Sequence, residues 1–183
     1  MAVTIRPAGD DDLEAADALV VASINDLTER HGFGSIATRS PPLLQRFSLR
    51  DDPQGVWVAE DEGEIVGFGF SWTNEDLWFL AQLFVRPDRQ ADGLGGLLME
   101  KALAHARLRG ARSRALITFA FNRASQGLYI RHRLYPVTPL YLISAPKAVV
   151  AGRLKQSLLS AESLDLREAS SDRLAAIDRV ALG

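Results

Sequence analysis

Hydrophobic residues alternate with polar ones at the start of the chain and then change their spacing. Residues 3–6 alternate like a short strand, which Pro7 ends. From Asp10 onward, apolar residues recur three or four positions apart up to Leu27, which predicts an amphipathic helix with acidic residues at its start. Residues 31–42 contain two glycines and two prolines without a regular period. They predict a loop, followed by a short helix over residues 43–49.

The middle of the chain predicts three strands and a long helix. Residues 56–59 and 65–72 flank the turn-forming stretch 61–64 and predict a β-hairpin. Residues 77–85 are mostly apolar and aromatic, which is typical of a strand buried on both faces. Apolar residues at helical spacing then predict a helix over residues 94–108, which Gly110 ends.

The remaining patterns predict a strand, a helix and a strand. Residues 114–120 have the composition of a buried strand, residues 123–131 predict a short helix, and residues 137–144 predict a final strand interrupted by Pro139. An antiparallel hairpin followed by alternating strands and helices predicts an α/β fold with a mixed central sheet.

Composition excludes several classes of function. The 183 residues are 47% hydrophobic, which is enough for one substantial core, and the net charge of -2 leaves no basic surplus to bind nucleic acid. There are no cysteines and the three histidines are scattered, so neither a disulfide framework nor a metal site is expected. No run reaches the roughly 18 apolar residues of a membrane span. We therefore expect a cytoplasmic protein without a membrane partner.

The strongest local signal is the glycine-rich stretch 89–96, between a predicted strand and a predicted helix. Gly93, Gly95 and Gly96 allow a ligand to approach the backbone closely, and the following helix presents unpaired N–H groups to it. A diphosphate suits such a helix N-terminus, with Arg86 and Arg89 adding positive charge at its rim. The alternative is a tight strand-to-helix turn that binds nothing.

Two blocks of sequence resemble one family. Residues 85–98, VRPDRQADGLGGLL, are similar to the acetyl-CoA signature of the GNAT superfamily of N-acetyltransferases, Gln/Arg-x-x-Gly-x-Gly/Ala after a strand. Residues 122–129, NRASQGLY, are similar to that family's Asn-x-x-(Ser/Ala)-x-x-Leu-Tyr segment. The order of elements over residues 3–144 also follows the family. The resemblance implies a GNAT-like α/β (α+β) fold, with a mixed, mostly antiparallel central sheet flanked by helices.

The resemblance also implies a cofactor and an activity. It indicates acetyl-CoA as the cofactor and transfer of the acetyl group to a primary amine of a small molecule or peptide, by direct attack on the thioester. The alternative is a catalytically silent acyl-CoA-binding or regulatory module. The positions that the resemblance assigns to cofactor binding are Leu83, Phe84, Val85, Gln90, Ala91, Asp92, Gly93, Leu94, Gly95, Gly96, Asn122 and Ser125.

Tyr129 is the candidate catalytic residue, because a phenol near the sulfur can protonate the departing thiolate. Its alternative role is that of a half-buried helix aromatic. Asn122 has the alternative role of a helix cap.

The general base is left open. Some family members carry a glutamate where Phe79 stands in this chain. Ordered water, Glu75, Asp76 or bulk solvent are the remaining routes. His31 and His132 are candidates by chemistry alone. The chain also departs from the family at Arg133 and Leu134, where a Gly-Phe pair is common.

The C-terminal segment predicts a second module. We expect a GNAT domain over residues 1–146, and residues 147–183 as a linker followed by the first strand and helix of a truncated second domain. Residues 165–183 resemble residues 4–22 at an offset of 161. Convergence of two capped helices explains the same similarity. If the tail is a truncated repeat, it docks on its own sheet or on a second copy, which would form a homodimer.

Overall fold

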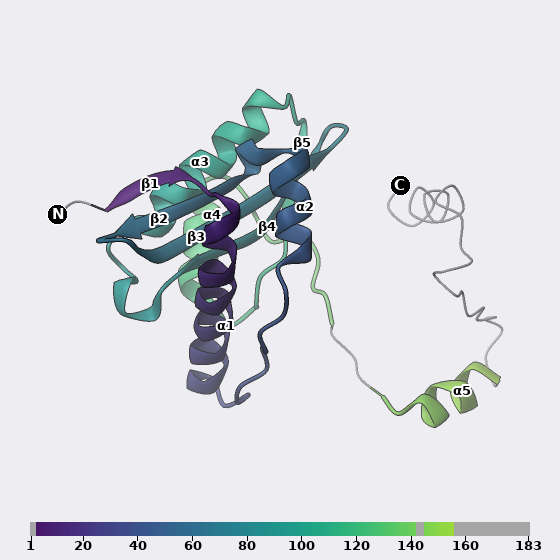
Figure 1. The fold of residues 1–183 in the computed structure, drawn as a ribbon. Coiled ribbons are helices and arrows are strands. Elements are labelled where there is room, and N and C mark those ends of the chain that lie inside the picture. The colour runs from purple at the N-terminus through teal and green to yellow at the C-terminus, as the bar shows by residue number, and fades with distance from the viewer. Residues whose placement is uncertain (1–2, 142–144, 156–183) are drawn as a thin grey trace. The chain divides into compact units, whose positions relative to one another are not determined.

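A computed structural model describes residues 3–141 and 145–155, and its coordinates divide after Pro139 into two units. The first unit contains a five-stranded sheet in the order β1-β2-β3-β4-β5 (Figure 1). Strands β1 to β4 are antiparallel, and β5 pairs with β4 in parallel. The strands are β1 (Thr4–Pro7), β2 (Val56–Asp61), β3 (Glu64–Asn74), β4 (Leu77–Val85) and β5 (Ser113–Leu116).

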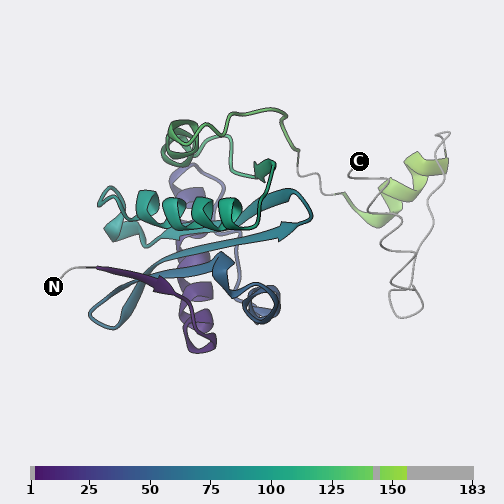
Figure 2. The same cartoon turned by 90° about the horizontal axis from the view of Figure 1, so that it is seen from above.

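Helices cover both faces of this sheet. Figure 2 shows α3 along one face and α2 on the other, where α1 also packs against β3 and β4. The helices of this unit are α1 (Leu13–Arg30), α2 (Leu43–Asp51), α3 (Leu94–Leu108) and α4 (Arg123–Arg131), with single 3₁₀ turns η1 (Asp10–Asp12), η2 (Pro53–Gly55) and η3 (Pro87–Arg89). The second unit contains α5 (Lys147–Lys155). Within the described ranges, no helix has the length and apolarity needed to cross a bilayer.

Two layers of core follow from the alternation of side chains along the strands. Toward α1, the buried residues are Ala8, Leu13, Ala16, Val20, Val56, Val58, Phe68 and Phe70. Toward α3 and α4, they are Trp78, Leu80, Met99, Ala102, Leu103, Ala106 and Tyr129. A further group, Ala59, Val66, Leu94 and Leu98, anchors the start of α3. The glycine-rich stretch is therefore attached directly to the buried part of the sheet.

The predicted fold class and most predicted elements are confirmed. The hairpin, the long helices and the short helix after residue 122 lie within a few residues of their predicted positions. The prediction that β4 is buried on both faces is wrong, since only Trp78 and Leu80 are buried and both pack with α3. The opposite face of β4 is only partly covered.

Two strand predictions at the end of the sheet are also wrong. Strand β5 ends at Leu116 rather than at residue 120, and Ile117 is 65% exposed, because the chain leaves β4 there. Residues 137–141 form no strand, which agrees with Pro139 having no N–H to donate to a neighbour, and Val137 is 93% exposed. The rest of that prediction, residues 142–144, lies outside the described residues, as does the predicted repeat at 165–183.

A β-bulge and a divergence of strands together open the sheet at one edge. Phe70 pairs with Gln82 and Ser71 with Leu80, so Ala81 is an extra residue in β4. Strand β5 pairs with β4 only from Leu77 to Leu80. Beyond the bulge, β4 has one edge that no described strand covers.

Candidate functional site

The open edge of β4 presents main-chain polar groups in alternation. The N–H of Arg86 donates to the carbonyl oxygen of Val66 at 3.0 Å, so residues 84 and 82 likewise direct their polar groups toward β3. Leu83 and Val85 therefore direct theirs to the open edge. The Val85 carbonyl accepts hydrogen bonds from Ser23 Oγ at 3.2 Å and Gln90 Nε2 at 3.3 Å. Three residues of this strand were predicted to bind the cofactor through the backbone. Of these, Phe84 directs its main-chain N–H and C=O toward β3 and not toward the open edge.

The start of α3 offers a row of main-chain donors. Gly93 adopts φ 84° as the N-cap, and its carbonyl accepts from Gly96 N at 3.0 Å and Leu97 N at 3.2 Å. The N–H of Gln90 donates to Pro87 O at 3.4 Å. The amides of Gln90 and Gly96 are thus bonded. The five amides between them donate to no group in the described ranges; they belong to Ala91, Asp92, Gly93, Leu94 and Gly95. Five consecutive donors without a described partner, at the positive end of a helix, are suited to an anion.

Gly95 lies where three elements meet. A Cβ added to it would lie 3.6 Å from Leu128 Cδ2 on α4 and 3.9 Å from Val85 Cγ2 at the end of β4. The fold itself therefore accepts a small side chain at this position. Because Gly95 has no side chain, the space between the free donors of α3 and the open edge of β4 stays open.

The predicted cationic rim is neutralised by carboxylates. Arg89 contacts Asp61 and, at 3.1 Å, Asp92, and these two hydrogen bonds raise its pKa. Arg86 contacts Asp88 at 2.7 Å and Glu64 at 2.8 Å, and the hydrogen bond from Arg86 lowers the pKa of Asp88. The rim thus carries two arginines and four carboxylates and has no net positive charge, so the main-chain donors are the unshared positive groups of the loop.

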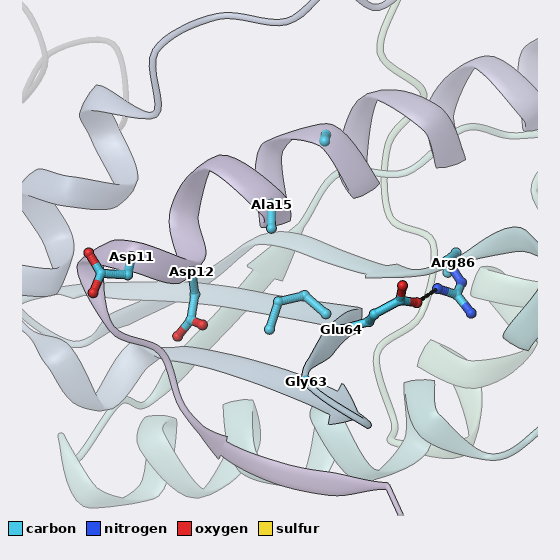
Figure 3. Close-up of a pocket in the computed structure, with 8 residues that line it drawn as sticks. Asp11, Asp12, Ala15, Gly63, Glu64 and Arg86 are labelled. Carbon is cyan, nitrogen blue, oxygen red and sulfur yellow. Dashed lines mark hydrogen bonds and ion pairs between the residues drawn. The ribbon is translucent and has the colours of Figure 1, made fainter.

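An open hollow beside Arg86 is a separate feature. Figure 3 shows the Arg86–Glu64 pair at one end of a hollow that Asp11 and Asp12 also line. None of the residues predicted to bind cofactor lines it. It is not the candidate site.

Helix α4 forms the far side of the site. Asn122 Oδ1 accepts a hydrogen bond from Ser125 N at 3.1 Å, so the predicted capping role of Asn122 is confirmed. Tyr129 is 8% exposed and packs in the same core group as Trp78 and Leu80 of β4. Burial raises the pKa of Tyr129, and the neighbouring Ser125 hydroxyl partly offsets this effect. The phenol therefore keeps its proton throughout the neutral range.

Comparison with known proteins identifies the family. The Acetyltransferase (GNAT) family model matches residues 21–133. The chain belongs to this family. It is thus an acetyl-CoA-dependent N-acetyltransferase. It is 35% identical over 112 residues to an uncharacterized N-acetyltransferase of Archaeoglobus fulgidus, covering 56% of this chain and 72% of the relative.

Two further proteins resemble this chain over part or most of its length. A mycothiol acetyltransferase of Streptomyces coelicolor is 37% identical over 84 residues, which is 44% of this chain and 26% of the relative's length. The crystal structure of the PaiA N-acetyltransferase of Thermoplasma acidophilum, in complex with coenzyme A, superimposes with a TM-score of 0.55 at 14% identity. That alignment covers 72% of this chain and 89% of the other. At this identity the likeness establishes the fold alone.

The departure from the GNAT pattern after Tyr129 leaves the helix end intact. Leu134 N donates to Tyr129 O at 3.0 Å and Arg133 N donates to Ile130 O at 2.9 Å, which are the two bonds of a Schellman motif. Arg133 takes the left-handed position of that motif with φ 63°. The chain thus makes the turn that glycine makes easily, with a residue for which the conformation is strained.

Arg133→Gly is therefore expected to stabilise the protein, by about 1 kcal/mol. The change relieves the left-handed strain and removes an exposed side chain that makes no hydrogen bond or ion pair within the described part of the chain. Chemical denaturation measures it, with Arg131→Gly, inside the last turn of α4, as the control that should lose stability. An unchanged or lower free energy of unfolding in Arg133→Gly would contradict the placing of Arg133 at the strained left-handed position.

Two of the residues considered as general bases are already engaged: Asp76 in an ion pair, and His31, whose Nδ1 lies 2.8 Å from Leu27 O. Asp76 is paired with Arg112 at 2.7 Å, at the end of β4 where β5 still pairs. Phe79 stacks on Trp72, with ring centroids 5.2 Å apart. The one polar side chain of β4, Gln82, accepts a hydrogen bond from Gln45 Nε2 at 3.0 Å. Strand β4 thus supplies no carboxylate to this GNAT site.

One buried polar cluster was not predicted from the sequence. His105 on α3 is buried, with Nδ1 2.9 Å from Ser71 Oγ and Nε2 2.8 Å from Asp52 Oδ2. All three residues are buried, and Ser71 is fully enclosed, so the serine cannot attack a substrate. The cluster joins α3 to β3 and to the end of α2. The sequence signal for the burial of His105 is the apolar Ala102, one helical turn earlier on the same face of α3.

Asp92→Asn is expected to strengthen coenzyme A binding roughly twofold, with a smaller gain at high salt, because it removes an exposed negative charge from the donor loop and leaves Arg89 with Asp61 as its one carboxylate partner in the described residues. Titration at two salt concentrations measures the effect. Asp88→Asn, which removes a similar charge outside the donor row, is the control and should change affinity less. Weaker binding by Asp92→Asn would mean that the carboxylate helps rather than opposes the cofactor.

Proposed function

We propose that the protein transfers the acetyl group of acetyl-CoA to a primary amine of a small molecule or peptide, by direct attack of the amine on the thioester. The observation that carries this proposal is the row of five free N–H groups at residues 91–95, beside the open edge of β4. The two features suit two parts of one ligand. The donors suit a diphosphate, and an unpaired strand edge suits the amides of a pantetheine arm.

The geometry refines the roles of the predicted residues. Ala91, Asp92, Gly93, Leu94 and Gly95 would bind the diphosphate through their N–H groups, whereas Gln90 and Gly96 would support the loop with bonds they already make. Leu83 would pair with the pantetheine arm through its main-chain groups, and Val85 would do so through its N–H, because its carbonyl already accepts from Ser23 and Gln90. Phe84 would contribute packing only. Asn122 would position α4, and Ser125 would lie beside the cofactor.

Tyr129 would act as the general acid. Acetyl-CoA, when bound, supplies an activated acetyl group and leaves a thiolate that must gain a proton. The buried phenol of Tyr129 retains its proton on Oη at neutral pH and can donate it. Its ring is held in the core beside Trp78 and Leu80 of β4.

Deprotonation of the acceptor would not use a side chain of β4. Since an alkylamine has a pKa of roughly 10.4, most of it is charged at neutral pH. We expect the neutral amine to come from solvent or to lose its proton to ordered water. The rate would then rise with pH as the neutral form increases.

The experiment is thiol release from acetyl-CoA in the presence of a panel of primary amines, after coenzyme A binding has been measured by calorimetry. Release that depends on an amine, with a matching acetylated product by mass spectrometry, is expected. Saturable coenzyme A binding without release for any amine would instead identify the silent acyl-CoA-binding module. Absence of binding would overturn both.

Three predictions from the sequence accompany this proposal. We propose that the enzyme acts in the cytoplasm, that residues 1–146 form the catalytic domain, and that residues 147–183 begin a truncated second module that pairs with its own sheet or with a second copy. Cell fractionation tests the compartment, and expression of residues 1–146 alone tests the catalytic domain. Size-exclusion chromatography of the full chain tests the pairing with a second copy.

A further inference from the structure

Four aromatic side chains form a cluster on the surface of the molecule. The ring of Phe121 lies at the centre, with centroids 4.8 Å from His31, 4.9 Å from Phe33 and 5.0 Å from Phe119. Phe33 is 62% exposed and Phe119 is 36% exposed. Stacked rings that remain open to solvent present a flat apolar surface, and such a surface is typical of a binding site.

The cluster joins the open edge of the sheet to the end of α1. Phe119 and Phe121 belong to the segment that leaves β4 after Leu116, and Phe121 directly precedes the α4 cap Asn122. His31 and Phe33 directly follow α1, whose Ser23 contacts the carbonyl of Val85. The rings therefore belong to the same segments that border the open edge of β4, and they contain none of the diphosphate donors.

The loop that carries Phe33 is held by its own hydrogen bonds. Asn25 Oδ1 accepts from Ile36 N at 3.0 Å and from Ala37 N at 2.8 Å, and Asn25 Nδ2 donates to Ala37 O at 3.0 Å. Thr28 Oγ1 donates to Gly34 O at 2.6 Å, and Phe33 N donates to Thr28 O at 2.9 Å. An exposed ring fixed in this way loses little freedom when a ligand stacks on it.

We propose that this cluster binds the acceptor, and that the acceptor is a primary amine carrying an aromatic ring. The inference rests on the proposed function, because it assigns the second substrate of the same site. A small polar amine would leave the rings in water, whereas a planar ring on the amine would cover Phe33 and Phe119. The carboxylate of Glu29, two residues before His31, accepts a hydrogen bond from the neutral Ser35 hydroxyl of the same loop, has no ion pair among the described residues, and would attract the ammonium group.

The test compares matched amines and matched variants. The full-length protein is saturated with acetyl-CoA, and kcat/KM is measured for 2-phenylethylamine and for propylamine. We expect a preference of about tenfold or more for the aromatic amine, as ring stacking and apolar burial of a phenyl group would provide. Phe33→Ala should remove most of that preference and leave coenzyme A affinity unchanged. Phe47→Ala is the control, because Phe47 is 56% exposed on α2 and stacks on none of the described rings.

Binding measurements separate this inference from the proposed function. Binding of each amine to the coenzyme A complex is followed by saturation-transfer NMR in the wild type and both variants. If coenzyme A binds but the two amines bind and react equally, or if Phe33→Ala keeps the preference, the aromatic acceptor is wrong while the cofactor site stands. If coenzyme A itself does not bind, the proposed function fails and the acceptor assignment fails with it.

Discussion

Gly95→Asp is expected to weaken coenzyme A binding at least 100-fold, which corresponds to about 2.7 kcal/mol, without unfolding the protein. The fold accepts a side chain at position 95, since an added Cβ makes only ordinary contacts with Leu128 and Val85. An acidic residue in the first turn of a helix is also favourable to the helix. The carboxylate would, however, occupy the space beside the free donors and repel the diphosphate. Calorimetric titration with coenzyme A measures the loss.

Two further variants separate the ligand effect from the helix effect. Gly95→Ala should raise the free energy of unfolding by about 0.5–1 kcal/mol while still weakening binding about tenfold, because a methyl group narrows the approach to the donors. Gly127→Ala makes the same change inside α4, where the nearest atom to the new Cβ is Arg131 Nη1 at 3.9 Å. It should gain stability without losing affinity. Normal coenzyme A affinity in Gly95→Asp would remove the donor row from the site.

Tyr129→Phe is expected to lower kcat by about 100-fold or more while leaving coenzyme A affinity unchanged, because it removes one hydroxyl proton and keeps the ring in the core. Leu128→Met is the control, since it alters a neighbouring packed residue without touching an acid. Equal kcat in Tyr129→Phe and the wild type would assign the tyrosine to packing alone.

The pH profile provides an independent check on Tyr129. Burial raises its pKa above the ordinary value near 10, so its neutral form persists below that pH and is lost only as pH rises through the raised pKa. Activity should therefore increase with pH as the acceptor amine loses its proton, with no decline assignable to Tyr129 below pH 10. A decline near pH 7 to 8 would point to a different acid.

Local sequence signals predicted the N-terminus of α3 well. The glycines at 93 to 96 stand at a strand-to-helix junction, and both the left-handed N-cap at Gly93 and the free amides follow from that short stretch. Asn122 likewise caps the helix that its own sequence begins. These features depend on residues within a few positions of one another.

Features that depend on distant partners were not predictable in the same way. The length of β5 is limited by where it leaves β4, since the two strands pair only from Leu77 to Leu80, and this pairing joins segments more than 30 residues apart. Arg86 and Arg89 carry charge in the sequence, but Glu64 and Asp61 come from the β2–β3 hairpin to neutralise them. The burial of His105 similarly needs Asp52 and Ser71.

The most direct test is an NMR titration of the backbone amides with coenzyme A. The amide protons of residues 91–95 should shift together and saturate, and ADP, which carries a diphosphate but no thiol arm, should shift them too. Pantetheine, without the diphosphate, should leave these five amides in place. Saturation with coenzyme A that leaves all five unmoved would contradict the account.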